Sequence, residues 1–216
     1  MKLRAKEELI NFLDNSSKIR KRELISLNGI IQGKGREHEK MIACRSAILL
    51  SYAHWEGFVK EAAKAYISYV AFKAPFLDKV KANFQAIACK PYFMIAGKAT
   101  NRIAPHIEIV RQFTDLITVN SVKTMIDIET AINTESNLGW DVFENICQTI
   151  GIDHNHWSIN GQFINDLRDS RNSIAHGGLD RPDEKYSTEV IKFVLESIDQ
   201  FKAQIENAAL TDAYLR

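Results

Sequence analysis

The chain has 216 residues, of which 45% are hydrophobic and 25% are charged, and its formal net charge is +1 at pH 7. This length is enough for one large domain with a buried core, and the composition is typical of a soluble globular protein. A net charge so close to zero excludes an argument for a nucleic-acid partner from overall charge alone.

Two long helices are predicted at the start of the chain. The first covers about residues 3–28 and ends near Asn28-Gly29, and the second runs from about 37 to 73 and stops before Pro75. The second helix is apolar nearly all round. A helix without a polar face belongs in the middle of a bundle or across a subunit interface.

The first helix carries most of the excess positive charge. Residues 1–36 contain nine Lys or Arg and four Asp or Glu, a net charge of +5, which leaves −4 on the rest of the chain. The densest basic patch consists of Lys18, Arg20, Lys21 and Arg22. It is either a solvated helix face or a surface that contacts phosphates, because clustered cations release condensed counterions when they bind nucleic acid.

The middle of the chain, about residues 75–158, is less regular. Helices are predicted over about 76–89, 105–118 and 138–150. Turns are predicted at Lys90-Pro91, at Gly97 and over Asp153–His156. Residues 120–131 fit a helix or a strand equally well.

Two further helices complete the prediction. One covers about 160–176 and is stopped by Gly177-Gly178, and the other covers about 188–209 with Ser187 as its N-cap. Three- and four-residue spacing of apolar residues dominates the chain, so the fold is expected to be all-α. The expected architecture is a single domain over 1–216, in which helices 37–73, 160–176 and 188–209 form a bundle and about 75–158 is an inserted helical region.

The compartment follows from the cysteines and the apolar segments. Three cysteines stand far apart without a CxxC pair, as expected for buried free thiols in a reducing compartment. They are Cys44, Cys89 and Cys147. The first residues lack the apolar core of a signal peptide, and the most apolar stretch, near 41–59, contains charged residues. The sequence therefore predicts a cytoplasmic protein that does not bind membranes.

An arginine lies on the apolar side of the helix predicted over 160–176. At about 100° per residue, Arg171 falls among the apolar side chains that form the buried stripe. These are Phe163, Ile164, Leu167, Ile174 and Ala175. A buried arginine needs a partner, since an unpaired buried charge costs several kcal/mol. Glu56, at the edge of the apolar stripe of helix 37–73, is a candidate ion-pair partner, or else an ordinary carboxylate at a helix boundary.

A polar stripe runs beside Arg171. Arg168, Asn172 and His176 follow one another at four-residue intervals, and His176 stands directly before two glycines. The helix C-terminus favours a protonated imidazole, and glycine lets a ligand approach the backbone closely. An ideal helix places Arg171 and His176 roughly 140° apart. The two side chains would converge only if the last turn loosens, if the arginine reaches around, or if a second subunit contributes.

The segment Arg171-Asn172-Ser173-Ile174-Ala175-His176-Gly177 resembles the Arg-x(4–6)-His motif of the HEPN superfamily. Residues 45–70, which contain YAHWEGF, resemble the first core helix of stand-alone bacterial HEPN proteins linked to genome conflict. The two segments together cover about a quarter of the chain. The resemblance implies an α-helical bundle that forms a homodimer with the motifs of the two subunits facing across one cleft.

The resemblance also implies a chemistry. In active members the histidine exchanges a proton with the ribose 2′-hydroxyl and the arginine neutralises the scissile phosphate, so His176, Arg171 and Asn172 are the catalytic candidates, with Arg168 and Glu56 in support. Histidine titrates near neutrality and guanidinium offers a planar fork to phosphate oxygens. The expected function is metal-independent endoribonuclease cleavage of RNA by a toxin or phage-defence effector. A cognate antitoxin protein is an expected partner, and no cofactor is expected.

Several competing interpretations stay open. Arg171 and His176 could anchor the bundle and cap the helix in an inactive HEPN module that binds RNA, nucleotide or a protein, or the chain could be a structural helical adaptor. His154 and His156 make a weak metal site because Asp153 is their only acidic neighbour, so no metal is predicted. His54 is interpreted as a core or interface residue and the three tryptophans as core residues. Tyr92 and Phe93 form either a packed turn or a base-stacking pair.

Overall fold

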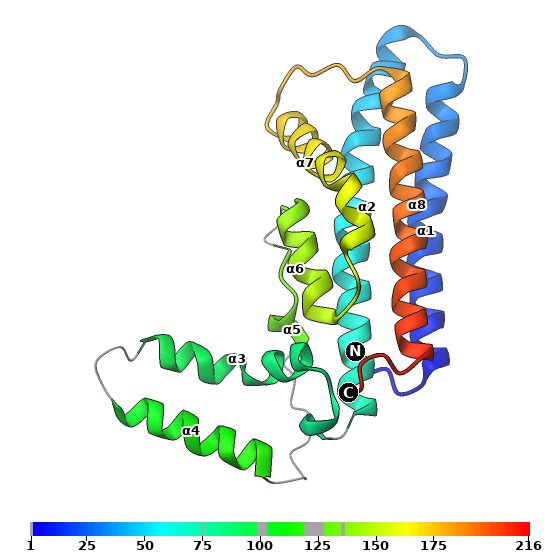
Figure 1. Cartoon of the computed structure of the whole chain (residues 1–216). Helices are drawn as coiled ribbons and strands as arrows, with labels where there is room; N and C mark the ends of the chain where they lie inside the picture. The colour runs from blue at the N-terminus through cyan, green and yellow to red at the C-terminus, as the bar shows by residue number, and fades with distance from the viewer. Residues whose placement is uncertain (1, 75, 99–102, 119–127, 135–136) are drawn as a thin grey trace.

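A computed structural model describes residues 2–74, 76–98, 103–118, 128–134 and 137–216, and it is all-α. Three long helices, α1 (Lys6–Gln32), α2 (Glu37–Lys73) and α8 (Glu184–Leu210), pack side by side along their lengths (Figure 1). Within these ranges the only β-type pairing is an isolated bridge between Val80 and Leu215. The all-α prediction is confirmed. In the same part of the chain, no helix combines the length and apolar composition needed to cross a bilayer.

Helix α2 is the central element, as its apolar sequence predicts. It packs against α1, α8, α7 and the short helices of the middle region, and its residues are buried on several sides. Trp55 lies in the middle of an aromatic cluster, with ring centroids 5.3 Å from Phe143, 5.8 Å from Trp157 and 6.1 Å from Phe201. Trp55 and Trp157 are fully buried and Trp140 is partly buried, so all three belong to the core. The three cysteines are free and buried.

The ends of α1 and α8 differ from the prediction. Helix α1 continues past Asn28-Gly29 to Gln32, because Leu27 and Ile31 are buried one turn apart and carry the apolar stripe beyond the glycine. Helix α8 begins before Ser187, since the Asp183 side chain accepts a hydrogen bond from the Tyr186 amide (2.7 Å) and caps the helix there. Ser187 is instead buried inside the first turns of α8.

The middle region contains α3 (Ala82–Lys98), α4 (Ile103–Thr118), α5 (Ile128–Ala131) and α6 (Trp140–Ile150). In Figure 1, α3 and α4 project away from the long helices. The turns predicted at Lys90-Pro91 and Gly97 are wrong, because α3 runs through both. Cys89 and Tyr92 pack on the core on either side of Pro91, which holds the helix together although proline removes one hydrogen bond.

Two further predictions in this region have mixed outcomes. Residues 119–127, most of the segment that fits helix or strand, lie outside the described residues, and helix α5 follows them. Tyr92 and Phe93 belong to α3 and not to a turn, and Phe93 is exposed.

Helix α7 (Gly161–Ala175) matches the predicted helix 160–176 to within one residue, and a 3-10 helix, Asn155–Asn160, leads into it. Helix α7 packs on α2 and inclines away from it towards its C-terminal end (Figure 1). Ile164, Leu167 and Ile174 are buried as predicted, whereas Ala175 is exposed. The segment that carries Arg171 and His176 therefore lies on the side of α2 that faces away from α1.

Candidate functional site

Arg171 lies over an aromatic ring of the central helix. Its guanidinium carbon stands 3.9 Å from the centroid of the Tyr52 ring. A guanidinium stacked on a tyrosine face contributes about 0.5–2 kcal/mol, more when the pair is shielded from water. The ring thus stabilises the charge that the sequence placed on an apolar stripe, and it fixes the plane of the guanidinium.

Tyr52 also connects Arg171 to the segment before α6. The Tyr52 hydroxyl accepts a hydrogen bond from the backbone amide of Leu138 (2.5 Å), and both residues are buried. Burial raises the pKa of the Tyr52 hydroxyl. A hydrogen bond with the Arg171 side chain and the Arg171 charge oppose that shift, and the Glu56 carboxylate adds to it. Tyr52 is therefore a neutral phenol near pH 7. The Asn172 side-chain amide donates to Asn137 Oδ1 (3.1 Å), which gives α7 a second link to the same segment.

His176 lies at the exposed end of α7, where two glycines turn the chain. Its amide still donates to the Asn172 carbonyl (3.0 Å), so its backbone keeps the helical direction. The Gly177 amide donates to Ile174 (3.2 Å) and the Gly178 amide to Ser173 (2.8 Å), with Gly177 in the left-handed region at φ 85°. This is the Schellman arrangement, and it ends the helix directly after the histidine.

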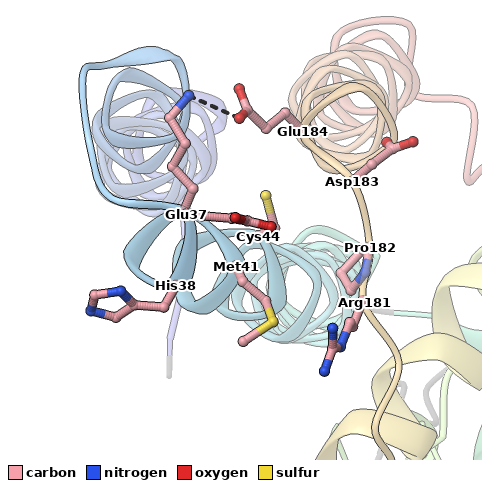
Figure 2. A pocket seen from close by; sticks show the side chains of 9 residues that line it. Glu37, His38, Met41, Cys44, Arg181, Pro182, Asp183 and Glu184 are labelled. Carbon is pink, nitrogen blue, oxygen red and sulfur yellow. Dashed lines mark hydrogen bonds and ion pairs between the residues drawn. The ribbon is translucent and has the colours of Figure 1, made fainter.

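Arg45 of α2 holds the loop that follows. Its guanidinium donates to the carbonyls of Gly178 (2.9 Å) and Asp180 (2.6 Å). The next residues of the loop, 181–183, and the first residue of α8 face the first turns of α2 across a pocket (Figure 2). The exposed His176 thus directly precedes a loop that is held by two sets of hydrogen bonds, those that close the end of α7 and those from Arg45.

The two supporting candidates lie near Arg171 but contact other groups. Glu56 is half-buried and acts on Tyr52 electrostatically, while no ion pair between Glu56 and Arg171 is found among the described residues. Arg168 donates from Nε to Asp169 Oδ1 (2.8 Å), and its guanidinium lies directly against the backbone of Gly139. Arg171 and His176 themselves have different surroundings, because one is stacked on the core and the other is exposed.

The basic patch of α1 is partly used inside the protein. Arg20 pairs with Glu61 of α2 (2.9 Å) and Lys21 with Asp199 of α8 (2.6 Å), whereas Lys18 and Arg22 are exposed. The patch is on α1, across the bundle from α7 (Figure 1). The structure therefore does not bring the patch and the Arg171–His176 segment together within one chain.

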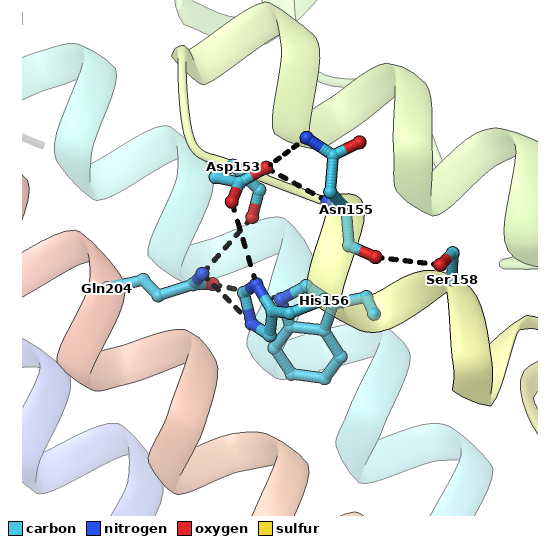
Figure 3. A network of polar contacts seen from close by, with 6 residues as sticks. Asp153, Asn155, His156, Ser158 and Gln204 are labelled. Atoms are coloured by element: carbon cyan, nitrogen blue, oxygen red, sulfur yellow. Dashed lines mark hydrogen bonds and ion pairs between the residues drawn. The ribbon is translucent and has the colours of Figure 1, made fainter.

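The histidines before α7 hold the loop that leads into the helix. His156 stands 3.1 Å from Gln204 Nε2, and the same amide donates to the Asp153 carbonyl (3.1 Å) (Figure 3). Asp153 Oδ1 accepts from the Asn155 amide (2.9 Å), a bond that keeps the pKa of this carboxyl below its usual value. His154 pairs with Glu144 (3.0 Å).

Within the described part of the chain there is no group of three or more His, Cys, Asp or Glu that could hold a metal ion. His54 pairs with Glu23 of α1 (2.9 Å), and burial lowers the pKa of its imidazole. It therefore joins two helices of the bundle.

Gly178→Ala is expected to disrupt the turn after His176. An added Cβ would stand 2.7 Å from the Ser173 carbonyl oxygen and 3.1 Å from its carbonyl carbon, and backbone cannot move aside as a side chain can. We expect a loss of about 1–3 kcal/mol in the free energy of unfolding, measured by urea denaturation. Gly29→Ala is the matched control, since no atom other than its chain neighbours and its own helical backbone lies within 4 Å of the added Cβ, and the position is helical. Equal stability of the two variants would show that the Gly178 turn is not closed.

Sequence reasoning missed Tyr52 and Arg45 as part of this site. Both lie on α2, seven residues apart and thus on one face of the helix. The available signal was Arg45 itself, one of the few charges within a nearly continuous apolar helix. Its two backbone acceptors lie 133 and 135 residues away in the chain, and no local pattern reports them.

One comparison with known proteins identifies a family. A family model described as RiboL-PSP-HEPN matches residues 15–207, which include α2, the middle region, α7 and nearly all of α8. Comparisons with curated proteins and with solved structures returned no match. The match points in general terms to a nuclease or another RNA-related function. Since it spans most of the sequence, the chain belongs to the RiboL-PSP-HEPN family.

Proposed function

We propose that this protein is a metal-independent endoribonuclease in which Arg171 binds the scissile phosphate and His176 transfers a proton to or from the ribose 2′-hydroxyl. The observation that carries the proposal is the fixed placement of this pair: Arg171 is stacked on Tyr52, and His176 is presented at a closed helix end. Both lie within the range that the HEPN family model matches.

The chemistry needs only these two functions. A base removes the proton of the 2′-hydroxyl, whose oxygen attacks the adjacent phosphorus, and the 5′-oxygen of the next nucleotide leaves and takes a proton. The guanidinium neutralises the phosphate as charge develops on its oxygens. The products are a 2′,3′-cyclic phosphate and a 5′-hydroxyl. Asn172, beside Arg171 and bonded to Asn137, is placed to orient its neighbours.

The proposal includes a homodimer. Arg171 faces the core of its own chain while His176 is exposed, so we propose that a second copy brings its His176 to Arg171 across a shared cleft. Lys18 and Arg22 are the members of the basic patch best exposed for phosphate contacts along the RNA. A role as a toxin or defence effector with a cognate antitoxin, acting in the cytoplasm, is part of the same proposal.

The test is cleavage of a mixed-sequence single-stranded RNA by the purified full chain in EDTA. We expect cleavage by wild type and cleavage at least about 10²-fold slower by Arg171→Ala or His176→Ala, with Arg111→Ala, an exposed arginine of α4, as the matched control. Cleavage that EDTA abolishes, or that His176→Ala retains in full, would contradict the proposal.

A second candidate function rests on the Tyr52 stack. The contact of Arg171 with Tyr52 would also anchor α7 on α2 in an inactive module that binds RNA, nucleotide or a protein partner. An inactive module that binds RNA predicts RNA affinity without cleavage. The same incubation, followed by a measurement of RNA binding, separates it from the ribonuclease.

A further inference from the structure

A pocket opens at the end of the bundle beside the loop that follows His176. Its volume is about 570 Å³, within the range of small-molecule sites. It lies between the first turns of α2 on one side and loop residues 181–183 with the first residue of α8 on the other (Figure 2). Arg45 donates a hydrogen bond to the Asp180 carbonyl. Cys44 and Arg181, which precede and follow these two residues in the chain, both line the pocket. The pocket is therefore built on the same Arg45-bound loop as His176.

The pocket is within reach of a strand that passes His176. Five residue steps separate His176 from Arg181, so their Cα atoms are at most about 18 Å apart. Arg45 fixes two carbonyls in this interval, which holds the two positions at a constant spacing. A short single strand whose phosphate lies at His176 could place a neighbouring nucleotide in the pocket.

The charges of the lining favour a neutral ligand with N–H donors over a phosphate. The pocket has more carboxylates, namely Glu37, Asp183 and Glu184, than lysine and arginine side chains. Glu184 is paired with Lys40 (2.8 Å) and Asp183 caps α8, so both are already engaged. A phosphate here would meet uncompensated negative charge, whereas the amino and imino groups of a base edge would find acceptors.

Glu37 is the acceptor available to a ligand. Figure 2 shows its carboxylate directed across the space between the starts of α2 and α8, while His38 points away. No hydrogen bond or ion pair of this carboxylate occurs within the described residues. A carboxylate has two acceptor oxygens and can therefore receive two adjacent N–H groups, such as N1–H and N2–H of guanine.

Flat and apolar groups line the same opening. Met41 and Pro182 supply apolar surface, and the exposed Arg181 carries a planar guanidinium beside Met41 (Figure 2). Unpaired bases stack on guanidinium planes as well as on aromatic rings. A planar guanidinium, an apolar surface and one carboxylate acceptor are together suited to bind an unpaired base.

We propose that this pocket binds an unpaired nucleobase of the RNA strand, guanine in preference to the others, with Glu37 accepting from its Watson–Crick edge and Arg181 stacking on its face. The inference rests on the proposed ribonuclease function and adds a sequence preference to it. Cleavage is therefore expected next to guanine-containing positions of single-stranded RNA.

The test is a titration of the full-length chain with each of the four ribonucleoside 5′-monophosphates, followed by NMR of the histidine ring signals. His38 lines the pocket and His176 lies at the end of α7, so their signals distinguish binding in the pocket from binding at the proposed catalytic site. We expect GMP to bind most tightly and to move the His38 signal. Glu37→Gln is expected to weaken GMP binding about tenfold, and Arg181→Ala to weaken all four nucleotides about fivefold.

The controls are Glu7→Gln, an exposed glutamate in the first turn of α1, and Arg111→Ala. The mononucleotides have no phosphodiester to cleave, so this result does not depend on whether the chain is an active nuclease. Equal binding of the four nucleotides, an unchanged GMP affinity of Glu37→Gln, or shifts confined to His176 would each overturn the proposal. Tightest binding of a different base would overturn the preference for guanine.

Discussion

Replacement of His176 with glutamine is expected to lower the rate of RNA cleavage by about 10²–10⁴-fold, the usual contribution of a general acid or base. The free energy of unfolding is expected to stay within about 0.5 kcal/mol of wild type, because the side chain is exposed and the turn is closed by backbone groups. Glutamine keeps hydrogen-bonding capacity but cannot carry the proton. The measurements are single-turnover cleavage of a labelled RNA and urea denaturation.

Leu179→Gln is the matched control for this variant. Leu179 lies three residues further along the same loop and is 89% exposed, so its replacement changes the loop surface without removing a titrating group. We expect it to cleave RNA like wild type. If Leu179→Gln loses as much activity as His176→Gln, the loop surface and not the imidazole accounts for the loss.

Arg171→Ala is expected to lower both activity and stability. If the guanidinium binds the scissile phosphate as proposed, its loss should reduce cleavage about 10²–10³-fold, and the loss of the stack on Tyr52 should lower the free energy of unfolding by about 0.5–2 kcal/mol. Arg171→Lys keeps the charge but loses the planar fork, so its activity should stay well below wild type. Cleavage rates and urea denaturation curves of both variants provide the check.

Tyr52 variants separate the two roles of Arg171. Tyr52→Phe keeps the ring under the guanidinium but removes the acceptor of the buried Leu138 amide, which costs about 1–3 kcal/mol of stability. The activity of Tyr52→Phe per folded molecule should remain close to wild type.

For Arg171→Ala, full cleavage activity together with reduced stability would show that the arginine is purely structural.

The sequence allowed the principal helices to be predicted because their signals are local. The nearly uniform apolar composition of α2 indicated a central helix, and the two glycines after His176 indicated the end of α7. The turn predicted at Pro91 is wrong for the opposite reason. Its helix continues because residues on both sides of the proline are held by the core, a tertiary effect that no local pattern contains.

The site was predicted only in part. Arg171 on an apolar stripe called for a partner, and its guanidinium is stacked on the face of Tyr52, while no ion pair with Glu56 is found among the described residues. Tyr52 and Glu56 lie one turn apart on the same helix, so the sequence is consistent with a contact between Arg171 and either of them. The choice depends on the packing angle between α7 and α2, which is a property of the folded chain. The role of Arg45 depends on the path of the loop after Gly178, which is likewise a property of the folded chain.

The most direct test of the central claim, that Arg171 and His176 act together across a dimer, is a mixture of two inactive variants. Arg171→Ala and His176→Gln are refolded separately and together, and cleavage of single-stranded RNA is measured in EDTA. A mixed dimer retains one intact Arg171 and one intact His176 on opposite subunits, so we expect activity to return to within about fourfold of wild type. A mixture that is as inactive as each variant alone would contradict a site shared between two copies of the chain.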